Sequence, residues 1–157
     1  KMKKSLVAVL AVFSLANAEQ ISIGGTSFER VDALEAYEVG CASNDANACF
    51  EAGWIHYQRQ NLNKAIELYT KACNANNYKA CTNLGALYFS GEGVKVDIKK
   101  AKELFSKACE LGDGDGCNNT AFLYEQEKDI KTALKLYKKA CDLGHQIACV
   151  AYKELSK

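Results

Sequence analysis

Eight cysteines are the residues of this chain whose type and spacing point most directly to chemistry. They fall into four pairs with the same internal spacing: Cys41/Cys49, Cys73/Cys81, Cys109/Cys117 and Cys141/Cys149. A disulfide requires two Cα atoms within about 4.4 to 6.8 Å, whereas eight residues of continuous α-helix would hold them about 12 Å apart. If each pair is bridged, the chain must therefore reverse its direction between the two members.

Metal binding and thiol redox chemistry are the alternatives to disulfide formation. The sequence contains no Cys-x2-Cys motif, and its only histidines, His56 and His145, lie far apart in the chain. We therefore expect a structural role for all eight cysteines, with no metal site and no cofactor.

Motifs for nucleophilic or phosphate chemistry are missing from the sequence. It has no Ser-x2-Lys, Ser-Asp-Asn or Lys-Thr-Gly motif of the kind that serine β-lactamases use, and no Gly-x-Ser-x-Gly motif. The segment Gly91-x-Gly93 follows an expected helix and not a strand, which disfavours a phosphate-binding loop. Isolated carboxylates such as Glu51, Glu92 and Asp97 are interpreted as surface charges, so no catalytic residue is assigned.

The N-terminal segment is typical of a secretory signal peptide. Lysines at positions 1, 3 and 4 precede the apolar run 6–15, and Ala16-Asn17-Ala18 follows it. The apolar run is too short to span a bilayer, and we expect cleavage after Ala18, which leaves residues 19–157. Because all eight cysteines lie in that part, we expect a secreted or periplasmic, disulfide-bonded protein without a membrane anchor.

Composition and charge narrow the class of protein further. The chain is 48% apolar and 25% charged, which is ordinary for one globular domain and excludes a disordered chain. Without the three N-terminal lysines, 17 basic residues stand against 19 acidic ones. This balance predicts neither nucleic-acid binding nor a basic membrane-binding face, and we expect a monomer.

Two helical patterns recur around the cysteines. Before the first cysteine of each pair, apolar residues follow a helical period with lysines and glutamates opposite them, and we call these segments B helices. In one unit they are Ala65, Leu68, Tyr69, Ala72 and Cys73. After the second cysteine another apolar set defines the A helices. In the next unit these are Cys81, Leu84, Gly85, Leu87 and Tyr88.

Turns rich in asparagine, aspartate and glycine separate the two kinds of helix. Alternating A and B helices predict a solenoid of stacked helical hairpins. The expected elements of the single domain 19–157 are an entry helix at 28–41, repeats at about 46–73, 78–109 and 114–141, and a capping helix at 145–156.

The second repeat carries a resemblance to a known family. Its segments Cys81-x2-Leu84-Gly85-x2-Tyr88 and Ala101-x3-Phe105-x2-Ala108-Cys109 resemble a tetratricopeptide unit with added cysteines, which is typical of Sel1-like repeats. The loop Gly91-Glu92-Gly93-Val94-x2-Asp97 is similar to the Sel1 loop, and the cysteine spacing is similar to that of the Helicobacter cysteine-rich proteins. The first and third repeats have shorter loops at 58–63 and 126–129. The resemblance implies an all-α, right-handed α/α superhelix over the whole exported chain.

Two disulfide pairings fit the symmetry of the repeats. Bridges within each repeat, such as Cys49 to Cys73, would leave Cys41 and Cys149 unpaired at opposite ends of the solenoid. Sequential pairing uses all eight cysteines, and we adopt it: Cys41–Cys49, Cys73–Cys81, Cys109–Cys117 and Cys141–Cys149. Each bridge then closes a nine-residue loop, which contributes roughly 2.6 kcal/mol in the chain-entropy treatment.

The resemblance implies two different functions. Helicobacter cysteine-rich proteins are described as penicillin-binding proteins or β-lactamases, which implies binding or hydrolysis of a β-lactam or a cell-wall-like small molecule. No residue of this chain carries that chemistry, so it is the alternative. Tetratricopeptide-like arrays bind an extended peptide or small ligand on the concave face, and an exported scaffold with a peptide or protein partner is our prediction.

The binding residues are expected on one face of the A helices, one, five and eight residues past the cysteine. That face varies between repeats where the core does not, and its aromatic and asparagine side chains suit peptide recognition. Packing against the neighbouring repeat is the alternative for Phe50, Trp54 and Phe122. The expected binding residues, which include neighbouring asparagines, are Phe50, Trp54, Tyr57, Asn83, Phe89, Asn118, Asn119 and Phe122.

Overall fold

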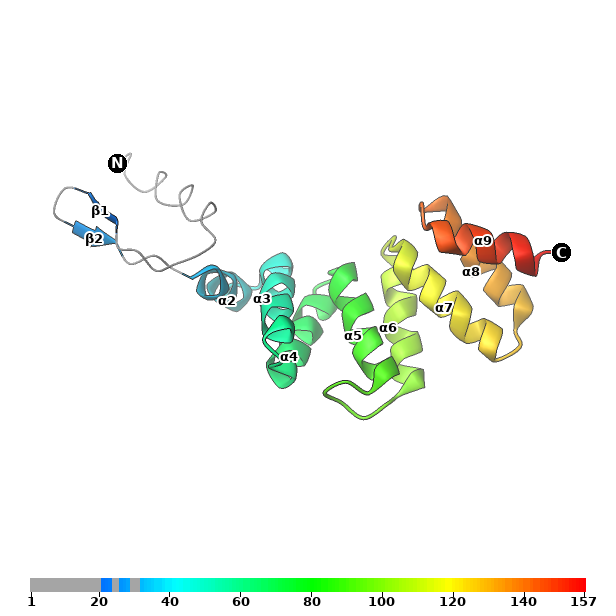
Figure 1. Ribbon diagram of the computed structural model, residues 1–157, viewed down its shortest axis with the longest axis horizontal. Coiled ribbons are helices and arrows are strands. Elements are labelled where there is room, and N and C mark those ends of the chain that lie inside the picture. The colour runs from blue at the N-terminus through cyan, green and yellow to red at the C-terminus, as the bar shows by residue number, and fades with distance from the viewer. Residues whose placement is uncertain (1–20, 24–25, 29–31) are drawn as a thin grey trace.

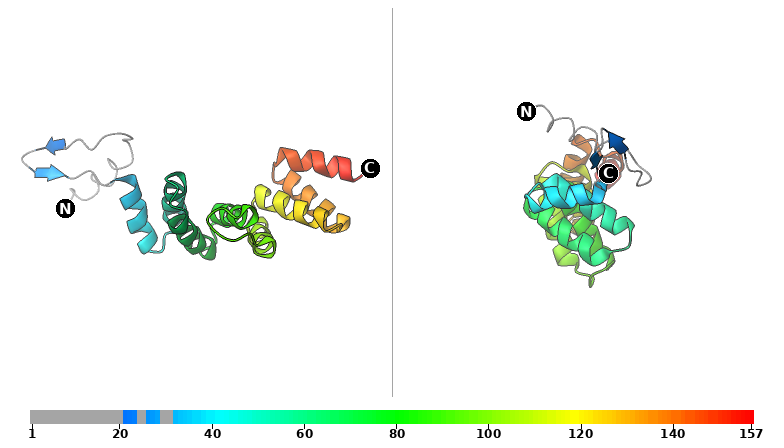
Figure 2. Two further views of the ribbon diagram at one scale, coloured as in Figure 1. Left: turned by 60° about the horizontal axis from the view of Figure 1, so that its bottom comes forward. Right: turned by 90° about the vertical axis from the view of Figure 1, so that its left-hand side faces the viewer.

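The computed structural model describes residues 21–23, 26–28 and 32–157. The expected signal peptide, residues 1–18, lies outside the described residues. Figure 1 shows helices that follow one another along the long axis of the molecule, and Figure 2 shows the same row from two further sides. The helices are α2 (Ala33–Ala42), α3 (Ala46–Gln58), α4 (Leu62–Asn74), α5 (Tyr78–Ser90), α6 (Ile98–Glu110), α7 (Gly114–Gln126), α8 (Ile130–Asp142) and α9 (Gln146–Leu155).

Successive helices pack against each other and make an α-helical solenoid. The A helices are α3, α5, α7 and α9, and the B helices are α2, α4, α6 and α8. The core between them holds mainly small residues and cysteines with a few large side chains, among them the buried rings of Tyr69 and Phe105. Glycines permit the close approach of A and B helices, because a Cβ on Gly53 would lie 2.8 Å from the Tyr69 ring and one on Gly85 would lie 2.7 Å from the Phe105 ring.

Each turn from a B helix to an A helix has the same backbone conformation. The third residue after the first cysteine has a positive φ in every repeat, a conformation that glycine and asparagine tolerate best. These residues are Asn44, Asn76, Gly112 and Gly144. The residue that follows accepts a backbone N–H with its side chain and so caps the A helix. These caps are Asp45, Asn77, Asp113 and His145.

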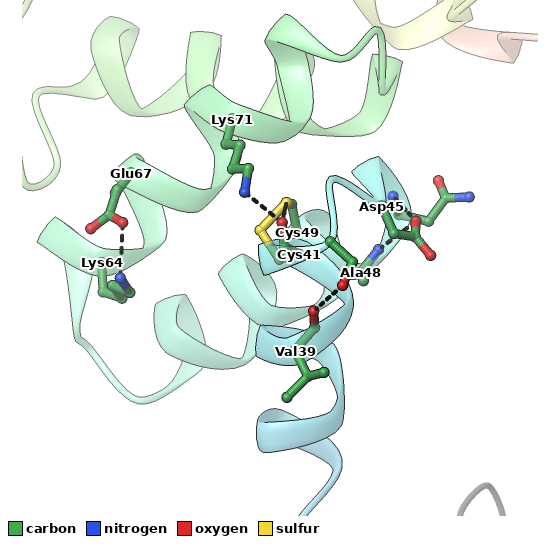
Figure 3. Close-up of a disulfide and its surroundings, with 10 residues drawn as sticks. Val39, Cys41, Asp45, Ala48, Cys49, Lys64, Glu67 and Lys71 are labelled. Carbon is green, nitrogen blue, oxygen red and sulfur yellow. Dashed lines mark hydrogen bonds and ion pairs between the residues drawn. A yellow bond between two sulfur atoms is a disulfide. The ribbon is translucent and has the colours of Figure 1, made fainter. Parts of the chain in front are cut away.

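Disulfides close these turns. All eight cysteines are paired in sequential order, with Cα–Cα distances between 4.4 and 4.7 Å. Figure 3 shows the first bridge, Cys41–Cys49, which joins the last turn of α2 to the first turn of α3. The chain reversal between paired cysteines that the spacing requires is thus provided by a helical hairpin in each repeat.

The N-terminal side of the solenoid differs from the expectation. The entry helix begins at Ala33 and not near residue 28, because β1 (Ile21–Ile23) and β2 (Thr26–Phe28) form an antiparallel pair with Ile21 opposite Phe28. Only β1, with the sequence Ile-Ser-Ile, alternates polar and apolar residues, and three residues are too few for such a pattern to identify a strand reliably. None of the described helices has the length and apolar character needed to cross a membrane.

Candidate functional site

The A helices α3, α5 and α7 together border a cleft of about 540 Å³. Three of the eight residues expected to bind a ligand belong to its lining: Phe50, Trp54 and Asn83. We call it the first cleft, and its lining residues are Phe50, Glu51, Trp54, Tyr78, Lys79, Thr82, Asn83, Asp113 and Asp115.

Aromatic side chains from α3 form one wall of the first cleft. Trp54 is 40% exposed and stacks on Tyr57, with ring centroids 5.9 Å apart. Phe50 stacks on the buried Tyr69 at the same centroid distance, and the Lys79 ammonium lies 5.9 Å from the Phe50 ring. Phe50 is therefore shared between the core and the cleft, whereas Trp54 offers an exposed apolar surface to a ligand.

A neutral polar pair connects the first cleft with the core. The Asn83 amide donates to the Tyr69 hydroxyl over 3.4 Å. Burial raises the pKa of Tyr69 to about 12, so its hydroxyl stays protonated at physiological pH. The carbonyl oxygen of Asn83 is left available to accept a hydrogen bond.

Two aspartates form the opposite wall. Asp113 caps α7 by accepting from the Gly116 N–H over 3.1 Å, and the same carboxylate accepts from the Thr82 hydroxyl. Asp115 is 68% exposed and lies 3.2 Å from Nε2 of His145. Asp113 thus fixes α5 against α7, while Asp115 projects its charge into the cleft and the solvent.

The remaining expected binding residues lie outside the lining of the first cleft. Phe89 on α5 and Phe122 on α7 meet edge to face, with ring centroids 6.4 Å apart, and each is 42% exposed. The Asn118 amide donates to Asn119 over 3.5 Å. The Tyr57 hydroxyl donates to Glu92 over 3.2 Å, and the negative charge of Glu92 raises the pKa of Tyr57. The structure brings Phe50, Trp54 and Asn83 together in the lining of the first cleft and places Tyr57 against Trp54 outside that lining. The other four lie elsewhere on the A helices.

Comparison with family models decides the family. The Sel1 repeat model matches residues 36–77, 79–113 and 115–145, which is more than half of the chain. The chain belongs to the Sel1 repeat family.

Solved structures agree with this Sel1 assignment. Helicobacter pylori cysteine rich protein B is 33% identical with a TM-score of 0.63, over 76% of this chain and 91% of that one. A Sel1 repeat protein from Oxalobacter formigenes is 25% identical with a TM-score of 0.70, over 80% of this chain and 56% of that one. This chain thus spans little more than half of the Oxalobacter protein.

A third structure shares the fold of this Sel1 chain at lower identity. It is c5321, a protective antigen present in uropathogenic Escherichia coli strains, which is 20% identical with a TM-score of 0.72, over 78% of this chain and 28% of that one. The search of curated protein sequences found no match.

Recurrent polar contacts hold neighbouring Sel1 repeats in register. A lysine two residues before the first cysteine of a pair donates to the carbonyl oxygen of the corresponding cysteine one repeat earlier. These contacts are Lys71 to Cys41, Lys107 to Cys73 and Lys139 to Cys109, and Figure 3 shows the first of them. They tie the B helix of each repeat to the end of the preceding B helix.

A second set of contacts joins the N-terminal ends of successive A helices. The cap residue Asn77 donates to Asn47 over 2.9 Å, and the cap residue His145 contacts Asp115 at the equivalent position two repeats later. From the sequence, the segment 112–116, which contains Asp113 and Asp115, was expected to be a turn, and Glu51 was interpreted as a surface charge. The sequence does contain a usable signal. The cap residue of each A helix and the residue two positions before the second cysteine of each pair lie at one edge of the A-helix face.

The β-lactam chemistry that the family resemblance implies finds no support in this geometry. His56 lies 2.8 Å from Glu38, and His145 caps α9, so the two histidines serve different helices. Every cysteine is bridged. Among the described residues, no group of three or more His, Cys, Asp or Glu side chains is arranged to hold a metal ion.

Proposed function

We propose that this Sel1 repeat protein is an exported scaffold that binds a peptide in the first cleft. The observation that carries the proposal is the exposed Trp54 beside the Asn83 amide, in a cleft bordered by three A helices. A peptide needs an apolar anchor site and hydrogen-bonding partners for its backbone, and these two side chains supply one of each.

Rigidity favours this function. Four disulfides and three lysine-to-carbonyl contacts hold the A helices before any ligand arrives. A preorganised site avoids the cost of ordering itself on binding, so more of the contact energy becomes affinity. Phe89 and Phe122 continue the aromatic surface along α5 and α7, and Asn118 and Asn119 add amides on α7, so we include all eight expected residues in the proposed surface.

Export is supported by the disulfides, which persist in secreted and periplasmic proteins and are rare in the cytosol. Four bridges in so short a chain are characteristic of such compartments. The expected signal peptide at residues 1–18 would provide the route.

The test is capture from a randomised peptide library by the purified, oxidised protein. Trp54→Ala and Asn83→Ala should each reduce peptide binding at least tenfold and leave the thermal unfolding temperature within a few degrees of the wild type. Lys131→Ala and Lys135→Ala, on the exposed face of the B helix α8, are matched controls that should bind like the wild type. Unchanged binding by both cleft variants would remove the first cleft from consideration.

A further inference from the structure

We infer that the bound peptide carries a lysine or arginine that sits over Asp115, with apolar residues on both sides of it. This inference rests on the proposed function and names the chemical class of its ligand. It follows from three features: a second cleft that continues the first, the charges along both clefts, and the apolar residues at their two ends.

The second cleft lies between the N-terminal ends of α7 and α9. It has a volume of about 420 Å³, and Leu143, His145 and Ile147 belong to its lining. Asp113 and Asp115 line this cleft and the first one alike. The two clefts therefore meet at these aspartates and offer one continuous path for an extended chain.

The charges along this path favour a basic ligand. The first cleft is lined by three carboxylates, those of Glu51, Asp113 and Asp115, against one ammonium, that of Lys79. The second cleft has no lysine or arginine in its lining. An anionic ligand would meet net repulsion at the junction, whereas a cationic side chain would be attracted to it.

Asp115 is the carboxylate best placed to pair with a ligand. Asp113 already accepts hydrogen bonds from Thr82 and from the α7 backbone. Among the described residues, Asp115 pairs with a single cation-forming group, His145, whose Nε2 lies 3.2 Å from the carboxylate. Nδ1 of the same ring accepts the Ala148 N–H over 3.1 Å and is therefore engaged at the start of α9. No lysine or arginine of the described residues pairs with Asp115, so its charge is available to a cationic ligand.

Apolar side chains lie at both ends of the path. Trp54 and Tyr78 are exposed in the first cleft, and Leu143 and Ile147 are exposed in the second. Ile147 is 72% exposed, and it occupies the position two before the second cysteine, where the earlier repeats have Asn47, Lys79 and Asp115. The exposure of an isoleucine at an otherwise polar position suits contact with an apolar residue of the ligand.

The experiment uses three pools of acetylated, amidated nonapeptides. The central residue is lysine, norleucine or glutamate, and the other positions are randomised among uncharged residues other than tryptophan. Trp54 is the only tryptophan of the chain, so its fluorescence reports binding to the oxidised protein. We expect the lysine pool to bind at least tenfold more tightly than the norleucine pool, with a preference that weakens as salt is added, and the glutamate pool to bind least.

Asp115→Asn is the decisive variant. It should abolish the preference for lysine and keep the affinity for the norleucine pool, whereas Glu110→Gln, on the exposed surface at the end of α6, should change neither. Equal binding of all three pools by the wild type would overturn the basic-residue assignment and leave the proposed function intact. A lysine preference that survives in Asp115→Asn would overturn the assignment to this carboxylate. Absence of binding by every pool would overturn the proposed function itself.

Discussion

The Lys107 ammonium on α6 lies 2.8 Å from the carbonyl oxygen of Cys73, at the end of α4 in the preceding repeat. Carbonyls in the last turn of a helix form the negative end of its dipole. The Cys73 oxygen already accepts from the Asn76 N–H over 3.0 Å, so the lysine adds a second, charge-assisted hydrogen bond at that negative end. Because equivalent contacts recur at Lys71 and Lys139, the same lysine-to-carbonyl hydrogen bond connects each repeat to the next.

Lys107→Met should lower the free energy of unfolding by about 1 to 2 kcal/mol, because it removes a charge-assisted hydrogen bond and keeps the aliphatic side chain and the helix propensity. Lys99→Met, at an exposed position on the same helix, is the matched control and should change stability by less than about 0.5 kcal/mol. Urea denaturation of both variants measures the difference. Equal stabilities would show that the contact in the structure carries no net energy.

Removal of the second disulfide should cost more than removal of the fourth. Replacement of Cys73 and Cys81 by alanine deletes a nine-residue loop closure of about 2.6 kcal/mol and also leaves space in the fully buried centre of the solenoid. Cys141 and Cys149 lie at a half-buried terminal position, so their replacement by alanine should cost mainly the loop closure. Thermal unfolding of the two double variants tests the order, and a reversed order would contradict it.

His145→Ala should destabilise the C-terminal helix by about 1 kcal/mol, because the α9 backbone loses its cap. His145→Asn should retain most of the stability, since Asn77 caps α5 at the equivalent position. Hydrogen exchange of the α9 amides resolves this local effect better than global unfolding does. Similar exchange rates in the alanine and asparagine variants would argue against a capping role.

Alkaline pH should destabilise the protein through Tyr69. Burial raises its pKa from 10.0 to about 12 in the folded state, so the unfolded chain loses this proton first. The contribution of the protonated Tyr69 hydroxyl to the free energy of unfolding is fully present below pH 10. It declines as the pH rises toward about 12, by roughly 2 to 3 kcal/mol in total. Tyr69→Phe should flatten this decline, whereas Tyr78→Phe, at an exposed position, should not. Rapid denaturation measurements across this range provide the comparison, and parallel curves for both variants would exclude Tyr69 as the cause.

Local rules made most of the solenoid predictable from sequence. The cysteine spacing required a chain reversal, and the asparagines and glycines between paired cysteines supplied the backbone conformation for it, as Asn44 and Gly112 show. The strands β1 and β2 were missed because each has only three residues. The start of the entry helix was placed too early because the strand at Thr26–Phe28 was not recognised. The helix begins only after Asp32.

The lining of the first cleft was less predictable from the sequence than the fold. Aromatic residues on one helical face were recognisable, and Phe50, Trp54 and Asn83 do line one cleft. The acidic wall was not recognised, because Asp113 has the sequence signature of a turn and a helix cap, which it also is. Only the packing of α5 against α7 brings this aspartate opposite Trp54, and such a relationship between repeats has no local pattern.

The most direct measurement is a map of backbone amide chemical shifts in isotope-labelled, oxidised protein, as one peptide from the lysine-centred pool is added. We expect the largest changes on α3, α5 and the N-terminal ends of α7 and α9, around Trp54, Asn83, Asp115 and Ile147. Changes confined to the outer faces of α4, α6 and α8, or no changes at all, would contradict peptide binding in the two clefts.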